Sequence, residues 1–231
     1  KYIATLSGAG GNGMIYTKTL AVYVGIEDFV MENGAAVRAD GANVNGLRFS
    51  AEMSEDTYNS LKAQGAVFGI VIVPKDYITA GYELTTVNLF GANAKYSATA
   101  VAGKNDVRRM LLLDDLTPRD ADGDGNYEIY GSITDILTNN ITREFVGVAY
   151  ACVNNEYILA SYYGNDIDNN TRSIYYVSQK AIDANDHRDA VQTKYIDKFD
   201  AYLEGLGKTY NVTYTVNYIR TSKGVTEVET E

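Results

Sequence analysis

Alternating apolar and polar residues along the chain predict half-buried β-strands. In residues 46–53 every second residue is apolar, and charged or polar residues occupy the positions between them. Residues 127–133 alternate in a similar way. Residues 67–73 and 142–153 are apolar on both faces, which is typical of central strands, and Pro74 is expected to stop the first of these two. These segments predict the centre of a β-sheet.

Weaker signals extend this sheet. Residues 156–163 can pair back on residues 142–153 across a turn at Asn154 and Asn155. Shorter β-prone stretches occur at residues 2–6, 14–24, 84–90, 96–101 and 107–113. The pattern therefore predicts a sheet that is mainly antiparallel.

Helical patterns are fewer and lie mostly towards the C-terminus. Ser54 is a suitable N-cap for a short helix that Gly65 can end. Residues 174–182 keep helical spacing, and Asp186 with Asp189 resembles a capping box at the start of the next helix. The apolar stripe of that next helix consists of Val191, Tyr195, Phe199, Tyr202 and Leu206.

Together these elements predict an α+β fold. We expect a mainly antiparallel, sandwich-like sheet packed by two C-terminal helices, with strand-rich appendages at both ends. The expected divisions are an N-terminal β segment (residues 1–33), a main α+β domain (34–207) and a C-terminal part (208–231). The last part returns to strict alternation, which predicts a β-hairpin or the start of a neighbouring repeat.

Composition narrows the classes of function. The net charge of −10 opposes binding to nucleic acid and to anionic membranes, and no apolar run approaches the length of a membrane span. Cys152 lies in an apolar run, whereas the one histidine, His187, lies in a polar stretch, so a cysteine–histidine enzyme is not expected. The 20 tyrosines suit strands, and they can also form a flat binding surface.

An acidic loop at residues 120–128 is the sharpest local motif. Asp120, Asp122 and Asp124 stand at alternate positions beside turn-forming glycines, an arrangement that can wrap oxygen ligands around Ca²⁺. Asn126, through its carbonyl, and Glu128 could complete the shell. The twelfth position of an EF-hand loop would be Gly131, so that class of site is excluded. The alternative is a solvated acidic turn.

Four arginines inside or beside apolar runs form a second candidate site. Because an unpaired buried charge is costly, each should have a partner. Ion pairs with Glu52, Glu128 or Glu144 are one interpretation, and a cluster that binds carboxylates or acidic sugars is the other. The four arginines are Arg38, Arg48, Arg143 and Arg172.

Four groups of segments, in this order along the chain, carry a resemblance to a known family. In order, they are residues 34–38 with 46–49, residues 68–74, residues 130–133 with 140–145, and residues 172–175. Over residues 34–207 they resemble an uncharacterised extracellular module of secreted, multi-domain surface proteins of gut Firmicutes. The resemblance implies an extracellular, secreted or cell-wall-attached setting beside Ig-like or β-repeat domains. It supplies no catalytic residues, and the acidic loop departs from it.

Sequence reasoning thus favours a non-catalytic cell-surface or adhesion module that binds a glycan or a protein, with calcium in the acidic loop. One alternative is a structural spacer without its own ligand, which a tyrosine-lined groove would argue against. A further alternative is a glycan-active enzyme, which would need two carboxylates that face each other across a cleft.

Overall fold

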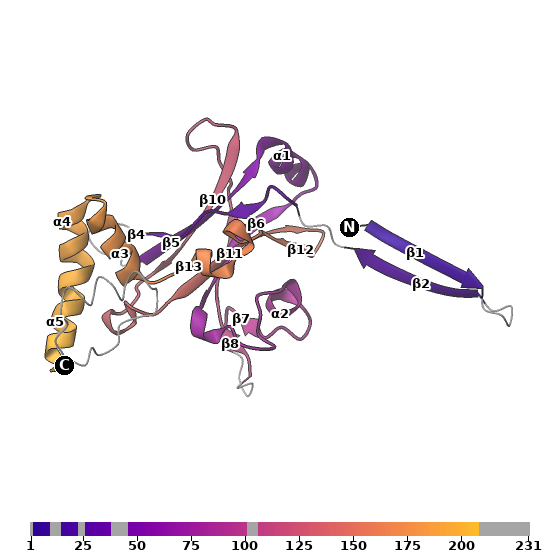
Figure 1. Ribbon diagram of the computed structural model, residues 1–231. Helices are drawn as coiled ribbons and strands as arrows, with labels where there is room; N and C mark the ends of the chain where they lie inside the picture. The colour runs from indigo at the N-terminus through magenta and orange to yellow at the C-terminus, as the bar shows by residue number, and fades with distance from the viewer. Residues whose placement is uncertain (1, 10–14, 23–25, 38–45, 101–105, 208–231) are drawn as a thin grey trace.

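Two larger antiparallel sheets organise the part of the chain that the computed structural model describes, which is residues 2–9, 15–22, 26–37, 46–100 and 106–207 (Figure 1). The first sheet has the order β10–β5–β3, with β4 also paired to β5, and the second has the order β12–β11–β6–β9, with β13 also paired to β11. Helices and mainly antiparallel strands occur together, which confirms the α+β class. The strands of the two sheets are β3 (Val30–Met31), β4 (Ala36–Val37), β5 (Gly46–Ser54), β6 (Val67–Pro74), β9 (Leu111–Leu116), β10 (Asn126–Thr134), β11 (Phe145–Val153), β12 (Glu156–Leu159) and β13 (Thr171–Arg172).

The strongest sequence patterns coincide with the observed strands. In β5, Leu47, Phe49 and Ala51 are fully buried, and the residues between them face outwards or are only partly covered. Both faces of β6 and β11 are buried, as their apolar sequences predict. Asn154 and Asn155 both have positive φ, at 51° and 63°, which is the conformation that a tight hairpin between β11 and β12 requires.

Glycines let the two sheets approach closely. A Cβ atom added at Gly147 of β11 would lie 2.5 Å from Cγ of Phe49 on β5. A Cβ atom added at Gly131 of β10 would lie 2.9 Å from Cβ of Ile70 on β6. The main core fills this interface, and it includes Phe29 and Met31, so it begins before residue 34.

A second core covers the other face of the second sheet. Val71 and Val73 of β6 and Val146 and Val148 of β11 pack against the segment between β6 and β9. That segment contains η1 (Lys75–Tyr77), α2 (Thr86–Phe90), β7 (Tyr96–Ser97) and β8 (Arg108–Arg109), and the last two strands pair in parallel. It lies below the sheets in Figure 1. The strand predicted at residues 84–90 is therefore wrong, because Thr85 accepts a hydrogen bond from the Asn88 amide and starts the short helix α2.

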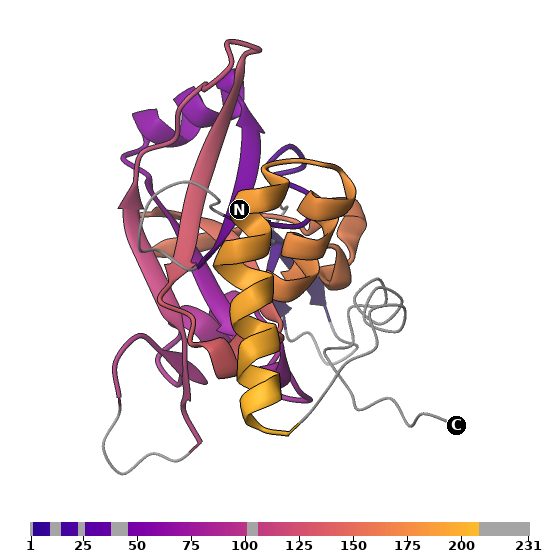
Figure 2. The ribbon, with the colours of Figure 1, turned by 90° about the vertical axis from the view of Figure 1, so that its left-hand side faces the viewer.

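Helices α1 and α3–α5 complete the main core. Ser54 caps α1 (Glu55–Ala63) by accepting from the Thr57 amide, and Gly65 follows with a positive φ, both as expected. Figures 1 and 2 show the C-terminal helices standing together at one end of the sheets. These helices are α3 (Ile174–Asp183), α4 (Arg188–Val191), the π-helical turn η5 (Gln192–Ile196) and α5 (Asp197–Gly205).

The predicted stripe of the last helix is only partly correct. Val191, Tyr195 and Phe199 are buried, but Tyr202 and Leu206 are exposed and Leu203 is buried instead. The π turn explains the change, because it holds an extra residue and rotates every later position. The predicted capping box is also wrong, since His187 occupies the N-cap of α4 and makes no capping hydrogen bond.

The N-terminal strands form a separate antiparallel pair. β1 (Tyr2–Ala9) and β2 (Ile15–Val22) pair in register from Tyr2 opposite Val22 to Ala9 opposite Ile15. In Figure 1 this pair lies apart from the two larger sheets. Short helical turns complete the description, namely η2 (Thr138–Asn140), η3 (Tyr163–Asn165) and η4 (Ile167–Asn170). The described residues do not include Arg38 or residues 208–231, where the sequence predicts a β-hairpin or the start of a neighbouring repeat.

Deleting residues 208–231 is expected to leave a domain that unfolds cooperatively. Among the described residues, the buried side chains of both cores lie between Phe29 and Leu203, and we expect their apolar burial to be enough to drive folding. Thermal unfolding followed by circular dichroism, compared with the full chain, measures this. Loss of the transition in the shortened chain would show that the tail belongs to the core.

Candidate functional site

The acidic loop joins β9 to β10 and is closed at its base by backbone hydrogen bonds. Arg119 and Glu128 exchange two of them, with N···O distances of 3.1 and 2.9 Å. Gly123 and Gly125 have φ values of 82° and 89°, a left-handed conformation that a side chain would strain. The two glycines therefore allow the chain to coil tightly between the acidic residues.

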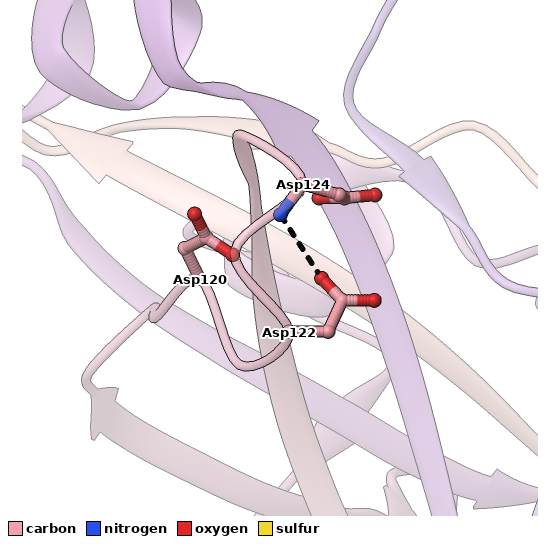
Figure 3. A group of neighbouring side chains, drawn as sticks. All are labelled: Asp120, Asp122 and Asp124. Atoms are coloured by element: carbon pink, nitrogen blue, oxygen red, sulfur yellow. Dashed lines mark hydrogen bonds between the residues drawn. The ribbon is translucent and has the colours of Figure 1, made fainter.

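Three aspartates of the loop lie close together around its backbone (Figure 3). Asp120 accepts hydrogen bonds from the amides of Gly123 and Gly125 at 2.6 and 3.2 Å, and Asp122 accepts one from the Asp124 amide at 3.3 Å. One oxygen from each of the three carboxylates lies within 4.8 Å of the others, and all three residues are exposed. Since a carboxylate has about four acceptor sites, these bonds leave capacity for a cation. Asp120, Asp122 and Asp124 could hold a metal ion.

The two other predicted ligands hold the loop in shape. Asn126 is the first residue of β10, and its amide groups donate to Asp124 at 2.8 and 3.0 Å. Glu128 is buried, and its carboxylate accepts from the Ala121 amide at 3.1 Å. Among the described residues, the group of acidic side chains with the spacing for a metal consists of the three aspartates and does not include Glu128.

The negative potential of the loop reaches the neighbouring strand. Glu52 of β5 lies directly opposite Glu128 of β10. Desolvation, followed by the charges of Glu32, Asp124 and Glu128, raises the pKa of Glu52 above its usual value. A bound cation at the loop would relieve part of this repulsion.

The predicted arginines have separate partners. Arg143 makes a two-pronged ion pair with Asp76, at 3.0 and 2.9 Å, and its guanidinium lies 5.1 Å from the ring centroid of Tyr77. Arg48 lies 5.1 Å from the ring centroid of Tyr130. The fourth arginine, Arg38, is outside the described residues.

Arg172 is held mainly by backbone. Its Nη1 donates to the carbonyl oxygens of Asp168 and Thr171 at 3.0 and 2.7 Å, and its Nη2 donates to the Asn33 side chain at 3.2 Å. Each of the three described arginines is therefore already engaged in a different place, which argues against a shared ligand.

A cluster of tyrosines and cations was not predicted from the sequence. Arg108 of β8 lies only 3.6 Å from the ring centroid of Tyr82 and 6.0 Å from that of Tyr77, and Lys95 lies 5.7 Å from the Tyr82 centroid. Arg143 extends the series on Tyr77. The only sequence signal was the abundance of tyrosine, because four of the members are spread irregularly along the segment between β6 and β9 and Arg143 lies elsewhere in the chain. We call this cluster the tyrosine–arginine face, which consists of Tyr77, Tyr82, Lys95, Arg108 and Arg143.

Comparisons of the chain with protein-family models, with curated proteins and with solved structures each find no match. Among the described residues, no helix is both long enough and apolar enough to cross a membrane. The acidic loop, the tyrosine–arginine face and the sequence pattern are therefore the features that bear on function.

Proposed function

We propose that the protein is a non-catalytic, extracellular cell-surface or adhesion module that takes up Ca²⁺ in its acidic loop and binds a glycan or a surface protein. The observation that carries the metal part is the convergence of Asp120, Asp122 and Asp124, whose oxygens lie within 4.8 Å of one another. Carboxylate oxygens are the ligands that Ca²⁺ prefers, and its flexible coordination suits an irregular loop.

The coordination shell would be shared between protein and water. Ca²⁺ takes about six to eight oxygen ligands. The three aspartates supply the charged ones, the Asn126 carbonyl is a further candidate, and solvent can fill the rest because the three carboxylates are exposed. Glu128 acts by fixing the first turn of the loop through the Ala121 amide.

The extracellular setting agrees with such a site. Exposed calcium sites of extracellular modules are commonly weak, with Kd around 10⁻⁴–10⁻³ M, and they fill only where calcium is abundant. The resemblance over residues 34–207 points to secreted or cell-wall-attached proteins in which neighbouring β-repeat domains flank the module. We also propose that the two sheets form a sandwich with the C-terminal helices against it, because Phe49 of one sheet lies against Gly147 of the other.

The ligand-binding part is supported by the tyrosine–arginine face. Tyr77 and Tyr82 are both only partly buried, and their rings lie beside cationic groups. Tyrosine and arginine are the residue types that contribute most to recognition surfaces. A spacer without a ligand would not need such a cluster, and this favours the binding module over the spacer.

A glycan array probed with the full chain, with and without millimolar calcium, tests this function. We expect the chain to bind selectively to a subset of glycans. If it binds no glycan on the array but does bind intact bacterial or host surfaces, the ligand is a protein. Turnover on a panel of glycosides, lost on replacing one Asp or Glu, would replace the binding module by the glycan-active enzyme. The same chain binding neither glycans nor surfaces would leave the spacer.

A further inference from the structure

One guanidinium nitrogen of the tyrosine–arginine face has no acceptor. Nη2 of Arg108 donates to the Thr79 hydroxyl at 3.1 Å, and the guanidinium lies against the Tyr82 ring. Nη1 of the same group is buried and makes no hydrogen bond in the part of the chain that the structure describes. Buried charged donors are nearly always paired, because an unmade bond of this kind is costly.

A second buried donor without a partner lies in the same region. The hydroxyl of Tyr162 has none among the described residues. Burial, followed by the proximity of Tyr96, raises the pKa of Tyr162. Burial also raises the pKa of Tyr96 to about 12, against the opposing charge of Arg108. Tyr82, Tyr96 and Tyr162 all pack on the second core, and Tyr96 donates its own hydroxyl to the Tyr82 carbonyl at 2.6 Å.

The chemistry of these groups selects the ligand. A guanidinium with a free N–H prefers a carboxylate, which it can bind with two parallel hydrogen bonds. The net charge of −10 repels a polyanion, whereas a molecule with a single carboxylate meets much less of that repulsion. Tyrosine rings offer flat amphipathic surfaces against which a sugar ring can pack.

We infer that Arg108 and Tyr82 form a binding site for a sugar that carries one carboxylate. The inference rests on the proposed glycan-binding function and names the class of glycan. Arg108 as a whole is only partly buried, and a carboxylate bound beside its guanidinium would supply the acceptor that Nη1 lacks. The sugar ring then packs beside Tyr82.

A matched pair of arginines tests the site. Oligosaccharides that end in glucuronic acid are titrated into the full chain, and those that end in glucose serve as the neutral control. Binding is followed by side-chain NMR signals of arginine and by calorimetry. We expect the acidic ligand to bind roughly tenfold or more tightly than the neutral one, and Arg108→Gln to remove this preference. Arg109→Gln should keep it, since Arg109 is the exposed neighbour on the same strand.

The outcomes separate this inference from the broader function. Equal binding of the acidic ligand by Arg108→Gln and the unchanged chain, with both melting normally, would overturn it. A chain that binds only neutral glycans would also overturn it and leave the proposed function standing. No binding of the glucuronide up to tens of millimolar would likewise overturn it. Arg108→Lys, which keeps the charge but not the paired donors, should bind more weakly than the unchanged chain.

Discussion

Replacing Gly147 by alanine is expected to destabilise the fold by about 3 kcal/mol. The new methyl group would lie 2.5 Å from Cγ of Phe49 and 2.8 Å from its Cβ and Cδ1. Phe49 is fully buried and has no room to swing aside, so the two sheets must separate or the ring must leave its rotamer. Urea unfolding monitored by circular dichroism measures the loss in the free energy of unfolding.

Two further variants establish the cause. Gly205→Ala is the control, because nothing lies within 4 Å of a Cβ atom at Gly205 and the residue ends α5, so we expect a neutral or slightly stabilising effect. Phe49→Leu in the Gly147→Ala background should recover part of the loss, since it removes ring atoms that the methyl group meets. Simple addition of the two single effects would contradict a direct clash.

Calcium is expected to raise the melting temperature by several degrees. An ion that binds only the folded state stabilises it by RT ln(1 + [Ca]/Kd), which is about 1 to 2.3 kcal/mol at the roughly five- to fiftyfold excess over Kd that about 5 mM calcium gives. For a domain of this size each kcal/mol corresponds to roughly 2–4 °C. Because the expected Kd is around 10⁻⁴–10⁻³ M, thermal unfolding is compared in EDTA and in several millimolar calcium.

Two variants and a second ion test whether the calcium effect on the melting temperature comes from the acidic loop. Asp122→Ala should abolish the response, whereas Asp189→Ala, which removes one exposed carboxylate from α4, should retain it. Magnesium should stabilise less, because it requires a more regular octahedral shell. An unchanged melting temperature in calcium would leave Asp120, Asp122 and Asp124 as a solvated turn held by its own amide hydrogen bonds.

Features that local chemistry decides were predictable from the sequence. The alternation in β5 and the Ser54 cap of α1 involve only neighbouring residues, and the structure shows both. The spacing of Asp120, Asp122 and Asp124 brought their carboxylates together for the same reason. Glu128 was predicted as a further ligand, but its carboxylate turns inwards and accepts from the Ala121 amide. This orientation depends on the course of β10 after the loop, which the local sequence does not determine.

Features that depend on distant contacts were not predictable. Arg108 and Tyr82 meet because the segment after β6 folds over the second core, and no spacing rule connects them. Nothing in the sequence around Phe29 and Met31 indicated that the main core begins before residue 34. The pairing of β3 with β5 nevertheless brings both side chains into that core. The arginines beside apolar runs were correctly expected to need partners, but the partners are not the glutamates expected; Arg143, for example, pairs with Asp76 of η1.

The π turn at Gln192–Ile196 also bears on how the length of this chain can vary in evolution. It places Val191 and Leu203 one position further apart than three ordinary α-helical turns require, yet both are buried. A chain that lacked one residue at this turn would continue as a plain α-helix and keep the same two side chains facing inwards. The loss of one residue at this turn would therefore require no compensating change at Val191 or Leu203.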